Sequence, residues 1–126
     1  MSEGAVNDGL ERRPGGPRRI VVLGTGTDVG KTYVAARLCE ALRARGTRVL
    51  GLKPIESGFT DEHTGDAAAL RAAAGLGARP LYGFVEPIGP HLAARRANTV
   101  IELEHVLGYV AEQERAQAPE VCVIET

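Results

Sequence analysis

The sequence predicts an α/β fold of three layers with a mostly parallel sheet. Apolar runs rich in Val, Ile and Leu at residues 20–23, 48–54 and 121–124 have the length and composition of buried strands. A helix-like segment at residues 32–45 separates the first two runs. A strand, a helix and a strand of these lengths fit a right-handed parallel crossover. The carboxyl ends of such strands face one crevice, where open α/β sheets bind ligands.

The totals describe an ordinary globular chain. Its 126 residues, 44% of them apolar and 25% charged, make one domain or part of one. A net charge of −1 argues against a nucleic-acid partner, and no apolar run is long enough to predict a membrane span. Cys39 and Cys122 have neither metal-like nor disulfide spacing, and the N-terminus lacks a hydrophobic signal segment. We therefore expect a cytoplasmic location, with no nucleic acid and no membrane as partner.

Residues 1–17 mix Gly, Pro, Asn and charged residues with almost no aliphatic periodicity. Such a segment cannot bury enough apolar surface to repay the entropy of ordering. We expect a disordered extension at 1–17 and a folded domain at 18–126.

Residues 24–32, with the sequence GTGTDVGKT, lie between the first strand and the first helix. A glycine-rich turn in this position directs backbone N–H groups and the positive end of the helix at one anion. Lys31 adds a mobile charge for the outer phosphates, and the Thr32 hydroxyl is placed to bind Mg²⁺. Five residues separate Gly24 from Gly30, where the usual pattern has four. A chance Lys-Thr after a turn would not explain the flanking strand and helix, so the segment predicts a P-loop NTPase-like fold.

Several helices and one brief strand are expected along the chain. Segments 67–74 and 91–97 are helix-like, and a short strand is predicted within 81–85. A longer helix should run from about residue 103 to 117 behind a capping box at 99–102. The helix at 32–45 should end at Gly46, with an apolar face of Val34, Ala35, Leu38, Ala41 and Leu42, and the later helix should bury Leu103, Val106, Leu107 and Val110.

Polar residues follow two of the predicted strands. Lys53 and Ser57 would lie beside the phosphate loop, either as binding residues or as a charged strand end and a turn. Asp66 stands before the alanine-rich helix, where the residue type alone favours an N-cap. Glu125 follows the last strand, the expected place for a second metal-associated acid in a fold with a phosphate loop.

Together these pieces resemble dethiobiotin synthetase, the ATP-dependent ring-closing enzyme of biotin synthesis. The order and spacing of the motifs agree from about residue 20 to 126, and the first two motifs are fairly specific in combination. Gly89 departs from the pattern, because the family usually has Ser before Pro-His. The segments that carry the resemblance are residues 24–32, 53–58, 65–67, 86–92 and 121–126.

The resemblance implies a reaction of 7,8-diaminononanoate, CO₂ and MgATP that yields dethiobiotin, ADP and phosphate. One amine captures CO₂ as a carbamate, ATP phosphorylates the carbamate, and the second amine closes a cyclic urea. Since carbamate and γ-phosphate are both anionic, bringing them together needs fixed positive charge. By resemblance, Lys31 and Lys53 would supply it from opposite sides of the carbamate.

Further roles are implied residue by residue. Thr27 would join the two lysines as a catalytic residue. The diamine and its carbamate would be bound by Thr27, Lys53 and Ser57, and Mg²⁺ by Thr32, Asp66 and Glu125. The nucleotide phosphates would contact Asp28, Val29, Gly30, Lys31, Thr32 and Tyr33.

Family members run on well beyond residue 126 and supply the adenine pocket and a homodimer surface from that part. We therefore expect an amino-terminal part of the enzyme, with little or no synthetase activity by itself. As a truncated product, its strand at 121–124 would have unpaired neighbours, and the exposed apolar surface would favour aggregation. Alternative interpretations are a nucleotide-dependent switch or partitioning ATPase, a fragment of a cobyrinate-type amide ligase, and an inactive remnant.

Overall fold

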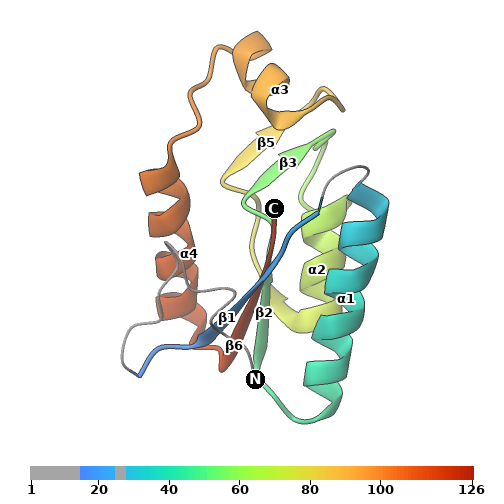
Figure 1. Cartoon of the computed structure of the whole chain (residues 1–126), viewed down its shortest axis with the longest axis vertical. Coiled ribbons are helices and arrows are strands. Elements are labelled where there is room, and N and C mark those ends of the chain that lie inside the picture. The colour runs from blue at the N-terminus through green and yellow to red at the C-terminus, as the bar shows by residue number, and fades with distance from the viewer. Residues whose placement is uncertain (1–14, 25–27) are drawn as a thin grey trace.

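A computed structural model describes residues 15–24 and 28–126 (Figure 1). Most of the predicted extension and the predicted site residue Thr27 therefore lie outside the described residues. The elements, in chain order, are β1 (Arg18–Val22), α1 (Asp28–Ala44), β2 (Val49–Leu52), β3 (Ile55–Ser57), α2 (Asp66–Ala74), β4 (Gly75–Gly77), β5 (Tyr82–Phe84), α3 (Pro90–Arg96), α4 (Leu103–Gln117) and β6 (Val121–Glu125).

The main sheet has the order β1-β6-β2-β4, and every neighbouring pair in it is parallel. In register, Ile124 of β6 lies opposite Val21 of β1 on one side and Leu52 of β2 on the other. Strand β6 is thus paired on both sides, and of its two neighbours β1 is an edge strand of this sheet among the described residues. The order of strands in a sheet is set by long-range packing, which a local apolar run does not reveal.

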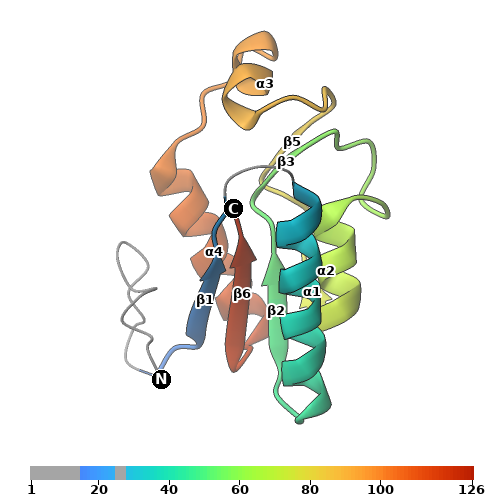
Figure 2. The ribbon, with the colours of Figure 1, turned by 45° about the vertical axis from the view of Figure 1, so that its right-hand side comes forward.

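Helices cover both faces of this sheet and produce the predicted three-layer fold (Figure 2). Helices α1 and α2 pack on one face, where their small residues allow close approach to Val49 and Val123. On the other face α4 contributes Val110. Because strand side chains alternate, neighbouring residues of one strand enter the two cores. The first core is formed by Ala35, Cys39, Val49, Leu70, Ala74 and Val123, and the second by Leu50, Leu52, Val110, Cys122 and Ile124.

Two helices differ from the prediction in their starts and faces. Helix α1 begins at Asp28, one turn earlier than expected, and ends before Gly46, whose φ of 86° is left-handed. Val34 is 56% exposed and Ala41 is also exposed, so the buried face contains Cys39 in their place. In α4, Leu103 is 70% exposed, and Glu102 is an N-cap without a side-chain hydrogen bond. The helical spacing of the apolar residues was predicted correctly. The buried face, however, is rotated around the helix toward the small residues that fit against the sheet.

The segment after β2 forms a second, smaller layer. Residues predicted as loop make the short strand β3, which pairs in parallel with β5. Helix α3 packs against this pair through Ala93 and Ala94, which contact Phe84. The strand expected within 81–85 and the helix expected at 91–97 are both confirmed. Among the described residues, no helix is long and apolar enough to cross a membrane.

Candidate active site

Three parallel strands bring the chemistry-bearing residues to one edge of the sheet. Strands β1, β2 and β6 run the same way, toward the end at which α1 begins (Figure 2). Lys53 and Thr126 directly follow β2 and β6, and Gly24 lies two residues after the end of β1. A Cβ at Gly24 would lie 2.9 Å from Lys31 Cγ, so the glycine leaves room for the lysine stem. The site therefore lies at the carboxyl edge, where parallel sheets of this kind bind ligands.

Glu125 is the buried centre of the cluster. It is fully buried at the end of β6, and both its carboxylate oxygens accept from Thr32 Oγ1, at 3.0 and 2.9 Å. Burial raises the pKa of Glu125, the charge of Lys53 and the hydrogen bonds from Thr32 and Lys53 lower it, and the nearby Asp66 raises it again. The hydroxyl of Thr32 thus links α1 to the end of β6 by hydrogen bonds.

Lys53 connects the two carboxylates of the site. Its side chain is 4% exposed, and Nζ lies 3.2 Å from Glu125 Oε2 and 3.8 Å from Asp66 Oδ2. A buried lysine needs such partners, because an unpaired buried charge is strongly unfavourable. The cluster brings Asp66 of α2 and Glu125 of β6 to the same ammonium group.

The two lysines share an acceptor. Lys31 Nζ donates to the main-chain oxygen of Thr126 at 3.1 Å, and Lys53 Nζ donates to the same oxygen at 3.4 Å. The ammonium groups, which come from α1 and from the end of β2, therefore converge on one electronegative atom. An oxygen held by two cations marks a position that suits an anion.

Asp66 is not the N-cap that its residue type favoured. Gly65 holds that position with a φ of 95°, and Asp66 is the first helical residue of α2. The cap is a side chain from ten residues earlier: Glu56 accepts from the backbone N–H groups of Asp66 at 2.9 Å and Ala67 at 3.1 Å. No sequence pattern had indicated a role for Glu56. The available signal was a carboxylate among the apolar and small residues of the segment PIESG, at residues 54–58.

The remaining predicted residues lie around this cluster without joining it. Asp28 and Val29 begin α1, followed by Gly30, so their backbone belongs to the helix N-terminus. Tyr33 is 64% exposed, with the Arg37 guanidinium 5.3 Å from its ring centroid. Ser57 is half-buried on β3, in register with Phe84 of β5.

The donor set of the cluster fits Mg²⁺. Mg²⁺ prefers oxygen ligands and is usually held by one or two carboxylates together with phosphate oxygens and waters. Thr32, Asp66 and Glu125 supply one hydroxyl and two carboxylates around Lys53. Over residues 15–24 and 28–126 no group of three or more His, Cys, Asp or Glu residues is placed to hold a metal ion. A magnesium ion here would therefore need phosphate oxygens and waters beside these protein oxygens.

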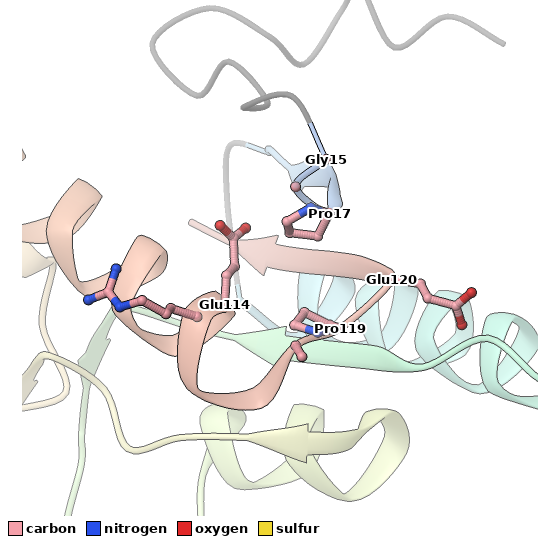
Figure 3. A pocket seen from close by; sticks show the side chains of 8 residues that line it. Gly15, Pro17, Glu114, Pro119 and Glu120 are labelled. Atoms are coloured by element: carbon pink, nitrogen blue, oxygen red, sulfur yellow. The ribbon is translucent and has the colours of Figure 1, made fainter.

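A cavity of about 560 Å³ lies at the other end of the sheet. Figure 3 shows Gly15, Pro17, Glu114, Pro119 and Glu120 around it. These residues belong to α4 and to the segments before β1 and β6, so they are at the amino ends of the strands. None of the predicted site residues lines this cavity.

Comparisons with known proteins agree with the motifs. A family model described as an AAA domain matches residues 18–126. Proteins named ATP-dependent dethiobiotin synthetase BioD are similar to the chain. The one from Corynebacterium diphtheriae is 35% identical over 84% of this chain and 47% of its own length. Those from Xylella fastidiosa strain 9a5c and Anaeromyxobacter dehalogenans are 40% and 41% identical, over 82% and 71% of this chain and 49% and 42% of their own lengths.

These relatives confirm the resemblance that the motifs predicted, and the chain spans about half the length of the curated relatives it matches.

Proposed function

Since the chain belongs to the AAA-domain family, we propose that it is part of an ATP-dependent ligase that forms the cyclic urea of dethiobiotin. The observation that carries the proposal is the convergence of Lys31 and Lys53 on one oxygen atom, beside Thr32, Asp66 and Glu125. A phosphate loop alone supports nucleotide binding. The second lysine, buried directly after β2, supports transfer to a second anionic group.

The proposed reaction has three steps. One amine of 7,8-diaminononanoate adds to CO₂ and loses a proton, which gives a carbamate. A carbamate oxygen attacks the γ-phosphorus of ATP, and ADP leaves. The second amine then attacks the carbamate carbon, loses its proton and expels phosphate, which closes the ring.

The residues of the chain act in this scheme by position and charge. Lys31 neutralises the transferring phosphoryl group, and Lys53 holds the carbamate from the other side. Thr27 and Ser57 donate hydrogen bonds to the diamine and its carbamate. The backbone of residues 28–33 binds the nucleotide phosphates at the N-terminus of α1.

Thr32, Asp66 and Glu125 would hold Mg²⁺, which supplies charge neutralisation on the phosphate oxygens when bound. The carboxylates of Glu125 and Asp66 in turn hold Lys53 in place, at 3.2 and 3.8 Å from its Nζ. We further propose a homodimer in the cytoplasm as the working form of the whole enzyme. Because the chain spans about half of its relatives, we expect little or no synthetase activity from the 126 residues alone.

One assay tests the proposal. The chain, and a version extended to the length of its relatives, are incubated with MgATP, bicarbonate and 7,8-diaminononanoate. We expect the extended version to make dethiobiotin and ADP in equal amounts. ATP hydrolysis that is independent of the diamine would indicate a nucleotide-dependent switch and contradict the ligase, and robust turnover by the 126-residue chain would contradict the expected need for the remainder.

A further inference from the structure

Glu56 is a buried carboxylate beside the candidate site that the proposed reaction does not use. It is 3% exposed, on the short strand β3, three residues after Lys53. We propose that Glu56 is a positioning residue that holds Asp66 for the Mg²⁺–nucleotide complex. This inference rests on the proposed function of the same site.

Both oxygens of Glu56 are committed to the first turn of α2. Oε2 accepts from the Asp66 N–H at 2.9 Å, and Oε1 accepts from the Ala67 N–H at 3.1 Å. These amides have no partner within the helix, and a negative charge at this end is favoured by the helix dipole. The carboxylate therefore fixes both the start of the helix and the direction from which the Asp66 side chain leaves it.

Gly65 shows how closely the carboxylate is fitted. A Cβ at this position would lie 2.1 Å from Glu56 Oε2, and its φ of 95° also disfavours any side chain. The Gly65-Asp66 pair and Glu56 thus form one interlocking contact. The backbone at residue 65 leaves the space that the carboxylate occupies.

The same contact links the two halves of the site. Lys53 directly follows β2, and its Nζ lies 3.8 Å from Asp66 Oδ2. Because successive side chains of a strand point to opposite faces, burial of Glu56 against α2 directs Ser57 away from that helix. Glu56 therefore fixes the position of Asp66 relative to Lys53, and it also fixes the face of β3 to which Ser57 points.

A carboxylate that only capped a helix would matter for folding alone, so the test measures Mg²⁺ as well as stability. Mg²⁺ is titrated against the version extended to the length of its relatives, with a fluorescent ADP analogue present, and the Mg²⁺ concentration for half-maximal enhancement of nucleotide binding is recorded. Glu56→Gln keeps the size but offers one acceptor oxygen in place of two. Glu56→Asp keeps both oxygens on a shorter stem.

The matched control is Glu114→Gln. Glu114 is equally buried, and its two oxygens also accept two hydrogen bonds, but from Arg19 on the other side of the sheet. This variant loses a buried charge without touching the site. Asp66→Asn reports the effect of removing the proposed ligand itself.

We expect Glu56→Gln to raise the Mg²⁺ midpoint about tenfold, the usual effect of losing an outer partner of a metal ligand. Glu56→Asp should restore part of that loss, and Glu114→Gln should lower the melting temperature while the midpoint stays within about twofold. Melting temperatures that fall for Glu56→Gln and Glu114→Gln alike, with both midpoints unchanged, would reduce Glu56 to a helix cap and overturn the proposal.

Failure of the proposed function gives a different result. Extended wild-type protein that binds the ADP analogue in a Mg²⁺-dependent way but makes no dethiobiotin contradicts the ligase. In that case the Mg²⁺ midpoints of the Glu56 variants still decide whether Glu56 positions Asp66. An extended wild-type protein whose nucleotide binding does not depend on Mg²⁺ overturns both.

Discussion

The Nζ atoms of Lys31 and Lys53 lie 3.1 and 3.4 Å from the same main-chain oxygen, that of Thr126. Lys31 lies in the first turns of α1, which follows β1, and Lys53 directly follows β2. Strand β6, which leads to Thr126, lies between β1 and β2 in the sheet. The parallel sheet thereby turns residues far apart in the sequence into a single cationic position. What this pair of ammonium groups can bind depends on the side chains that hold each lysine in position.

Gly65→Ala should destabilise the fold. The new Cβ would meet Glu56 Oε2 at 2.1 Å in a left-handed backbone conformation, so strain and overpacking add to roughly 2–4 kcal/mol of unfolding free energy. Gly108→Ala is the control, because nothing lies within 4 Å of a Cβ there and the position is within α4. It should stabilise by up to about 1 kcal/mol. Urea denaturation measures both, and equal effects of the two changes would contradict this account of Gly65.

Removing one partner of the Arg19–Glu114 ion pair should lower the free energy of unfolding strongly, whereas replacing both with apolar residues should lower it little. Arg19 Nε and Nη2 each donate to Glu114 at 2.7 Å, and the side chains are 11% and 1% exposed. Arg19→Met leaves a buried carboxylate without its bidentate partner and should cost about 3–5 kcal/mol. Arg19→Met combined with Glu114→Leu removes both charges and should recover most of that loss in thermal unfolding. A double variant less stable than the single one would be contrary to expectation.

The thiol of Cys39 should be unreactive in the folded chain. Burial against the sheet, with a smaller contribution from Glu40, raises its pKa from 9.0 to about 11. At pH 8 the thiolate fraction is then roughly a hundredfold lower than in the unfolded chain. In a Cys122→Ala background, iodoacetamide should modify Cys39 at least that much more slowly in buffer than in urea. Similar rates in the two solutions would show that the thiol is accessible and ordinary.

The same shift predicts a pH dependence of stability. The folded-state pKa of Cys39 lies above the unfolded value, so the stabilisation is fully present below pH 9.0 and is lost as the pH rises through about 11. The free energy of unfolding should fall over this range in the Cys122→Ala chain and fall less when Cys39 is also replaced by Ala. Parallel curves for the two variants would contradict the assignment.

Local patterns predicted much of this molecule because the strand, phosphate loop and helix of residues 18–44 are adjacent in the chain. The roles of Glu56 and β6 were not predictable in the same way. Glu56 acts through the amides of Asp66 and Ala67, and β6 enters between β1 and β2 only when the sheet assembles. The apolar periods of α1 and α4 were read correctly, but residues such as Val34 and Leu103 show that the face depends on which residues fit the partner surface.

The central claim is that Lys31 and Lys53 act from two sides on one anion, the substrate carbamate, and a double-variant cycle of kcat/KM for dethiobiotin formation tests it most directly. Lys31→Gln, Lys53→Gln and their combination are compared with wild type in the version extended to the length of its relatives, with folding verified by circular dichroism. The Gln at 53 keeps a hydrogen-bond donor for Glu125. A shared site predicts that both changes lower kcat/KM and that their effects on the activation free energy are non-additive by about 0.5–3 kcal/mol. Additive losses, or full activity in Lys53→Gln, would place the two ammonium groups in separate sites and contradict the account.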